Sequence, residues 1–278
     1  MALYAFDGTW NEDEKGEGKD TNVIKFYNAF QGPKFYLEGV GTRLGFIGKL
    51  LGGMAGAGGW FRIKEAMDEL ERNFNNGDKT VDIIGFSRGA ALALHFANEV
   101  EEEIPDVKIR FLGLWDVVAS FGLPGNDINI GWDLTLAGNV EHCYHAMALD
   151  ERRGNFKPTR VHPSRKGDST AGRLEEVWFR GVHSDVGGGM SIGLSTIALC
   201  WMMHRAITCG LPIASTELQR FQTMRDPGAP ISRNLDPIPD PMRRIEMTDK
   251  VHDSVQPRGN KDGIEHNDPP ASLTLVSD

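Results

Sequence analysis

The segment Val81-Asp-Ile-Ile-Gly-Phe-Ser-Arg-Gly-Ala90 carries the strongest structural signal in the chain. Its first five residues form a largely apolar, β-branched run, which is typical of a central parallel strand that is covered on both faces. The apolar residues from 90 to 100 predict a buried helix directly after it. A Gly-X-Ser-X-Gly pattern between a strand and a helix is typical of a sharp turn that exposes a serine oxygen above a sheet. We therefore predict that Ser87 is a catalytic nucleophile.

Strands and helices alternate on both sides of this segment. Apolar runs predict further strands at 3–6, 34–40, 109–115 and 176–182, and helical spacing predicts helices at 22–30, 60–74 and 194–209. Such alternation predicts an α/β fold with a mainly parallel sheet and helices on both faces. The length of 278 residues suits one domain, 1–278.

The C-terminal segment, 225–278, differs in composition from the rest of the chain. It holds eight of the fourteen prolines together with many charged residues. Proline interrupts both helices and central strands, so we expect an irregular layer that wraps the domain and carries the catalytic histidine.

The overall composition excludes several classes of function. Hydrophobic residues make up 40% and charged residues 25% of the chain, as in soluble globular proteins. The formal charge of -9 argues against nucleic acid and against a general attraction to anionic membranes. Three scattered cysteines fit a reducing compartment. The first residues show no secretory signal, so we expect a cytoplasmic protein as synthesised, with signal-less export left open.

A serine nucleophile needs a histidine base and a carboxylate that orients it, and in this fold both follow the serine in sequence. The glycine-rich loop 181–189 follows a predicted strand and holds Asp185 at its centre, so we predict Asp185 as the acid. His252, in an irregular region late in the chain, is placed as the fold requires and is our predicted base. The expected triad is Ser87, His252 and Asp185.

Two other residues are alternative members of the triad. Asp116 ends an apolar strand, at the edge of the sheet where active sites form. His183 lies in the same glycine-rich loop as Asp185. If neither belongs to the triad, each is expected to lie near the site and to form hydrogen bonds with residues that do.

Acyl transfer also needs two backbone donors for the oxyanion. The N–H of Arg88, directly after the nucleophile, is expected to be the first. The turn after the first strand should provide the second, from Gly8 or Thr9. Asp7 in that turn is expected either to cap it or to support the site.

Other chemistry has weaker support. His142 and His145 are spaced for a metal on a helix, but no third ligand is obvious and a solvated helix face is the favoured interpretation, so we expect no metal and no cofactor. The glycine-rich stretch Leu44–Trp60 is either a lid or lipid-facing surface, or a buried connection. A catalytically silent binding protein with the same fold is the alternative function.

Six blocks of sequence, in the same order, resemble one known family. They are Phe6-Asp-Gly-Thr-Trp-Asn11, Gly85-Phe-Ser-Arg-Gly-Ala90, Leu114-Trp-Asp116, Leu149-Asp-Glu-Arg-Arg153, Val182-His-Ser-Asp-Val-Gly-Gly188 and Val251-His-Asp-Ser254. The family is an α/β-hydrolase family, formerly a domain of unknown function, that includes bacterial type VI secretion phospholipase effectors. The resemblance implies an α/β-hydrolase-like fold and a serine esterase or lipase, with phospholipid acyl esters cleaved through an acyl-enzyme. It also implies transient contact with a membrane surface and an unidentified secretion or immunity partner.

Overall fold

The fold is described from a computed structural model of the chain. The structure describes residues 1–8, 20–39, 54–119, 131–163, 167, 169–233, 241–259 and 265–278. Within these ranges, no helix combines the length and the hydropathy that a membrane crossing requires.

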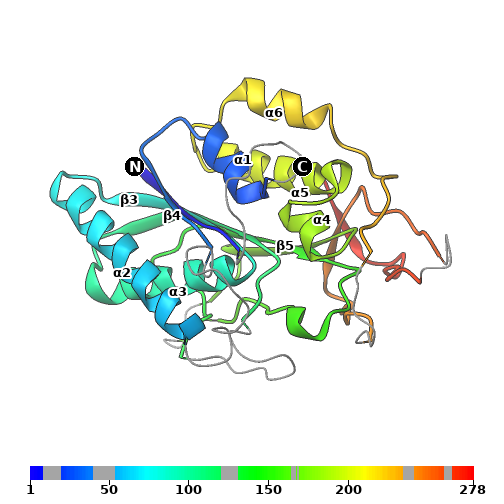
Figure 1. The fold of residues 1–278 in the computed structure, drawn as a ribbon, viewed down its shortest axis with the longest axis horizontal. Helices are drawn as coiled ribbons and strands as arrows, with labels where there is room; N and C mark the ends of the chain where they lie inside the picture. Colours follow the sequence, from blue (N-terminus) through cyan, green and yellow to red (C-terminus); the bar gives the residue numbers. More distant parts are fainter. Residues whose placement is uncertain are drawn as a thin grey trace.

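A single sheet of eight strands forms the centre of the domain (Figure 1). Its order is β2-β1-β3-β4-β5-β6-β7-β8, and every neighbouring pair is parallel. The bounds are β1 (Ala2–Phe6), β2 (Lys34–Leu37), β3 (Thr80–Phe86), β4 (Lys108–Trp115), β5 (Cys143–Ala148), β6 (Leu174–Phe179), β7 (Lys250–His252) and β8 (Thr274–Val276). The prediction of an α/β fold with a mainly parallel sheet is confirmed.

Helices cover both faces of this sheet. They are α1 (Asn22–Ala29), α2 (Met54–Asn75), α3 (Arg88–Glu103), α4 (His183–Gly187), α5 (Ile192–Thr208) and α6 (Ser215–Gln222), with a short 3-10 helix at Gly154–Phe156. On one face, Met67 of α2 and Phe96 of α3 join a buried cluster with Tyr4 of β1. On the other, Phe26 of α1 and Trp201 of α5 pack in a cluster with strand side chains. Figure 1 shows α2 and α3 on one side of the strands and α1, α5 and α6 on the other.

The C-terminal segment is more regular than its composition suggests. It contributes β7 and β8, which extend the sheet beyond β6. Each has three residues, so neither is long enough to show the alternation by which a strand is recognised in sequence. The irregular layer expected there thus includes two short strands that belong to the sheet.

The region around His145 also differs from its interpretation as a solvated helix face. Cys143–Ala148 is the strand β5, and the side chain of His145 is fully buried. Its Nδ1 lies 2.9 Å from Oε1 of Glu176 on the neighbouring strand β6. His145 is thus a partnered histidine of the core.

The strand order identifies where a ligand site should form. From β1 the chain moves outward to β2 and then returns past β1 to β3. In open parallel sheets, ligands bind beyond the carboxyl ends of the strands at such a change of direction. β1 ends just before Asp7 and β3 ends just before Ser87. The topology therefore places Ser87 at the expected site.

Candidate active site

The turn at Ser87 has an unusual backbone conformation. Ser87 joins β3 to α3 with φ 59° and ψ -127°, and its side chain does not cap the helix. Among the described residues, Ser87 and Asp116 are the two non-glycine residues with positive φ. Strain of this kind persists where the surrounding structure enforces it, commonly at functional sites. The two strained residues follow the neighbouring strands β3 and β4.

Two glycines allow α3 to approach the ends of the strands closely. A Cβ atom on Gly89 would lie 2.3 Å from the carbonyl oxygen of Phe6 and 2.4 Å from that of Asp7. A Cβ atom on Gly85 would lie 2.7 Å from Cα of Ala90. All three contacts are with backbone atoms, which cannot move aside as a side chain can. The strand–turn–helix arrangement predicted around Ser87 therefore depends on both glycines.

Replacing Gly89 with alanine should destabilise the whole domain. We expect Gly89→Ala to reduce the free energy of unfolding by about 3 kcal/mol, because overpacking against fixed backbone forces strands and helix apart. Gly228→Ala is the control, since its added Cβ would meet only a side-chain oxygen of Asp226 at 3.2 Å. The control should lose less than about 1 kcal/mol. Urea unfolding compares the two, and equal losses would contradict the packing argument.

His183 and Asp116 form a buried hydrogen-bonded pair beside the Ser87 turn. Nδ1 of His183, the first residue of α4, lies 2.6 Å from Oδ2 of Asp116. The imidazole ring packs against Phe86 and Phe156, with centroid separations of 4.6 and 4.8 Å. Because Phe86 directly precedes Ser87, this packing ties the imidazole to the serine turn.

The electrostatics of this pair suit a histidine base. Burial lowers the pKa of His183 and outweighs the opposing effect of Asp116. Burial also acts to raise the pKa of Asp116, but Arg243 and His183 together hold it well below its usual range. An ionised Asp116 can only accept a hydrogen bond, so Nδ1 of a neutral His183 must donate and Nε2 is left to take up a proton.

Arg243 is a site residue that the sequence analysis missed. Its Nη1 and Nη2 lie 2.6 and 3.1 Å from the two carboxylate oxygens of Asp116. The guanidinium also donates to the carbonyl oxygens of Ala148 and Phe156, at 2.7 and 2.5 Å. One arginine in a proline-rich segment with several others carries no sequence signal. The folded chain alone brings it to Asp116.

The end of β5 holds the backbone of His183. Oε2 of the buried Glu151 accepts a hydrogen bond from the His183 N–H at 3.1 Å. Arg153 pairs with Glu151 at 2.9 Å, and its guanidinium lies 3.7 Å above the ring of Phe156. Burial acts to raise the pKa of Glu151, but the opposing effect of Arg153 is larger. The pKa of Glu151 is therefore lowered, and the carboxylate stays ionised. Glu151 thus holds the backbone of His183, while Arg153 packs on Phe156, which contacts the imidazole.

Asp185 holds the C-terminal segment against α4. Its Oδ2 accepts hydrogen bonds from the backbone N–H groups of Val182 and Ser232, at 3.1 and 2.9 Å. Its Oδ1 accepts from the hydroxyl of Ser232 at 2.5 Å. No hydrogen bond joins Asp185 to His252 in the described parts of the chain. Asp185 thus has the contacts of a structural carboxylate.

His252 lies away from the serine turn. It belongs to β7, where Nδ1 is 2.8 Å from Oγ of Ser254 and Nε2 is 3.3 Å from Oδ1 of Asp278. Four strand intervals separate β7 from β3, which is roughly 19 Å at about 4.8 Å per interval. The structure therefore does not bring the expected Asp185–His252 pair to Ser87. It brings together Asp116 and His183, the alternatives from the sequence.

The expected oxyanion donors are only partly described. The Gly8 N–H donates to Oδ1 of Asp7 at 2.6 Å, and Oδ2 of Asp7 accepts from the hydroxyls of Thr21 and Tyr36, at 2.7 and 2.8 Å. Asp7 therefore stabilises the turn after β1. Thr9 lies outside the described residues. The N–H of Arg88 opens α3, where it has no partner four residues earlier within the helix.

The segment proposed as a lid, Leu44–Trp60, is described only in part. Residues 44–53 lie outside the described ranges, and the remainder forms the start of α2. Within the described ranges, no three potential metal ligands lie together.

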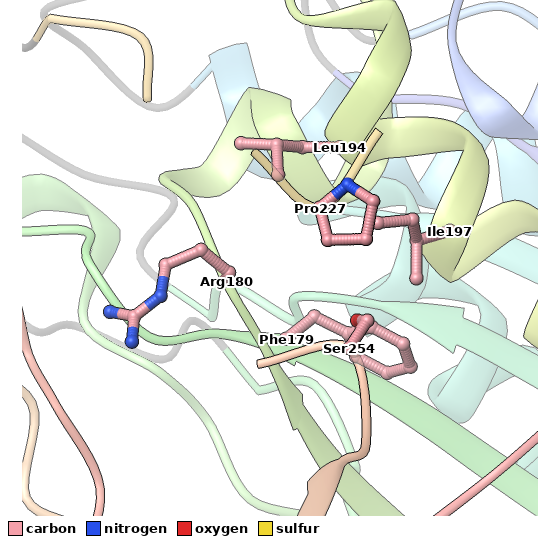
Figure 2. A pocket seen from close by; sticks show the side chains of 6 residues that line it. All are labelled: Phe179, Arg180, Leu194, Ile197, Pro227 and Ser254. Atoms are coloured by element: carbon pink, nitrogen blue, oxygen red, sulfur yellow. The ribbon is translucent and has the colours of Figure 1, made fainter. Parts of the chain in front are cut away.

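A small hollow lies between β6, α5 and the C-terminal segment. Figure 2 shows its lining residues, which are Phe179, Arg180, Leu194, Ile197, Pro227 and Ser254. The guanidinium of Arg180 points away from the apolar side chains in this view and pairs with Asp150 and Asp268. The hollow has no room for a water molecule. It lies near His252 and away from the serine turn.

A parallel α/β sheet with a strained serine at the change of strand direction defines the class of α/β-hydrolase-like proteins. The family model for the catalytic domain of Tle1-like phospholipase effectors of the type VI secretion system matches residues 3–102 and 93–205. These matches span more than half of the chain. The chain belongs to this family, which is described as one of lipid hydrolases.

Individual relatives are more distant. An uncharacterized protein of Saccharomyces cerevisiae is 26% identical over 222 residues, which spans 56% of this chain and 32% of the yeast protein. The crystal structure of an uncharacterized protein from Pseudomonas aeruginosa matches with a TM-score of 0.57 and 23% identity, over 80% of this chain and 48% of that one. The Tle1 effector bound to the VgrG spike matches with a TM-score of 0.48 and 23% identity, over 68% and 50%. The chain thus spans only a third to a half of these relatives.

Proposed function

We propose that the chain is a serine hydrolase of lipid carboxylic esters, phospholipid acyl esters above all. Ser87 is the nucleophile, His183 the base and Asp116 the orienting carboxylate. The observation that carries the proposal is the 2.6 Å contact between His183 Nδ1 and Asp116 Oδ2, beside the strained turn at Ser87. Membership of a phospholipase effector family supports the lipid substrate.

In the proposed reaction, Nε2 of His183 takes the proton of Ser87 while Oγ attacks the ester carbonyl. The N–H of Arg88 donates to the oxyanion that forms. His183 then returns the proton to the departing alcohol and leaves the acyl group on Ser87. Water, deprotonated by His183, releases the fatty acid and restores the serine. Ser87 and His183 are not hydrogen-bonded in this structure, and in free enzymes such contacts often tighten only when substrate binds.

A fluorophosphonate probe tests the nucleophile directly, and phospholipid micelles test the substrate class. A folded wild-type protein should become labelled and should release fatty acid. A folded protein that neither labels nor hydrolyses esters would overturn the proposal and favour a catalytically silent binding protein.

A plot of kcat/KM against pH should fall on its acidic side below about pH 6.5, which is the ordinary pKa of histidine. The base must be unprotonated, and burial lowers the pKa of His183, so activity should fall only as the pH drops through that lowered value. Arg243→Met removes a cation that lowers the pKa of His183, so this fall in activity should move to higher pH.

Arg243→Met should also cost about 3–5 kcal/mol of stability, because it leaves the charge of Asp116 buried with one partner fewer. Arg244→Met is the matched control, since the neighbouring Arg244 is 84% exposed and pairs with the exposed Glu246. The control should keep both the pH profile and the stability. A fall that stays at the same pH in Arg243→Met, measured on the folded fraction, would argue against His183 as the base.

A further inference from the structure

Arg88 is a partly buried cation that has no counter-ion among the described residues. Its Nε is buried and has no hydrogen-bond partner, which is also true of the Nε atoms of Arg180 and Arg243, so the difference lies in the rest of the guanidinium. No ion pair or hydrogen bond links its guanidinium to the described part of the chain. Burial lowers the pKa of Arg88. Desolvating a charge in this way is costly unless something compensates it.

Other buried arginines of this protein are compensated. Arg243 has both oxygens of Asp116, and Arg180 has Asp150 and Asp268. Arg110 pairs with the buried Asp82 at 2.6 Å. The fold therefore supplies carboxylates where an arginine serves structure, and Arg88 departs from that pattern.

The position of Arg88 indicates what its charge is for. It directly follows Ser87 and is the first residue of α3, whose first turn contains no acidic residue. The amino end of a 16-residue helix adds partial positive charge at the same place. The planar guanidinium can donate two parallel hydrogen bonds to two oxygens of one phosphate or carboxylate group. A guanidinium on the residue that follows the nucleophile is thus suited to an anionic group of the substrate.

We propose that Arg88 binds the phosphate group of the lipid whose acyl ester Ser87 attacks. The inference rests on the proposed function and adds its specificity determinant. In a glycerophospholipid, the phosphate and the acyl ester share the glycerol backbone and lie only a few bonds apart. A side chain adjacent to the nucleophile can therefore hold the one while the serine attacks the other. The guanidinium would complete its hydrogen bonds only with substrate bound.

Two substrates that differ only in the phosphate test this assignment. Dihexanoyl phosphatidic acid and dihexanoylglycerol carry the same acyl esters and are compared as dissolved monomers. Arg88→Gln should lower the ratio of kcat/KM for the first over the second by about ten- to a hundredfold, as expected for loss of a charged hydrogen bond. The change should lie mainly in KM. Arg72→Gln, on an exposed part of α2, should leave the ratio unchanged.

A binding measurement needs no catalysis. Calorimetry with glycerol 3-phosphate should detect binding to Ser87→Ala, no binding to Ser87→Ala/Arg88→Gln, and weakened binding to Ser87→Ala/Arg88→Lys. Inorganic phosphate should bind more weakly than glycerol 3-phosphate, because it lacks the glycerol. Equal binding of the two, without discrimination between the two esters, would overturn the assignment to a lipid headgroup and favour free phosphate.

The outcomes separate this inference from the proposed function. An active wild type whose substrate ratio is the same in Arg88→Gln would overturn the role of Arg88 and leave the hydrolase standing. A protein that hydrolyses neither ester but binds glycerol 3-phosphate through Arg88 would overturn the hydrolase and retain the phosphate site. Circular dichroism and thermal unfolding establish that each variant is folded before it is compared.

Discussion

Ser87→Ala is expected to lower kcat/KM for ester hydrolysis by about four orders of magnitude or more and to abolish fluorophosphonate labelling. The hydroxyl oxygen is the only atom removed, and in the proposed mechanism the acyl group is transferred to it. Ser87 is 4% exposed and its side chain does not cap α3, so the fold should tolerate the change. Steady-state kinetics and gel-based labelling provide the measurements.

Ser254→Ala is the matched control for the serine. The hydroxyl of Ser254 lies 2.8 Å from Nδ1 of His252, and this pair lies outside the proposed site. It should keep full labelling and full activity. If labelling survives in Ser87→Ala and disappears in Ser254→Ala, the nucleophile is Ser254 in the C-terminal segment and not Ser87.

His183→Ala should reduce kcat by about three to four orders of magnitude, because the serine loses its base. Asp116→Asn should have an effect of similar size, since an amide can donate to Nδ1 and hold the imidazole in the wrong tautomer. KM should change little in both variants, because neither side chain is proposed to hold the substrate.

His252→Gln distinguishes the two histidines that the sequence proposed. His252 is fully buried and stacks on Phe179 with 4.8 Å between ring centroids, so the variant will lose some stability. Its kcat at a temperature where it remains folded should stay within about threefold of wild type, because roughly 19 Å separates β7 from β3. A large loss of kcat in His252→Gln with retention in His183→Ala would restore the original assignment.

The sequence predicted much of the fold because its signals are local. The apolar run before Ser87 and the helix after it act over a few residues, and the same holds for the strand that ends at Trp115. β5 was missed because His142 and His145 suggested a helix, whereas the segment pairs with β4 and β6 in the sheet. β7 and β8 are stabilised by pairing with the sheet and are too short to be recognised alone.

The candidate site was harder to predict than the fold. Chain order and loop composition favoured Asp185 and His252, since both follow the serine in the sequence order that this fold uses for its acid and base. Neither signal reports distance. The segment that carries His252 adds strands beyond β6, which takes the histidine away from Ser87. The same segment brings Arg243 to Asp116, over 127 positions of sequence.

By itself, the sequence determined the α/β class, the Gly-X-Ser-X-Gly turn and the candidates for its partners. These features depend on hydrophobic periodicity and on residue types within short segments of the chain. Only the tertiary structure decided which candidates meet. His183 faces Asp116 because parallel strands end at one edge of the sheet and α4 starts there. Arg88 has no counter-ion among the described residues for a related reason, since the distribution of carboxylates around a side chain is a property of the packed molecule.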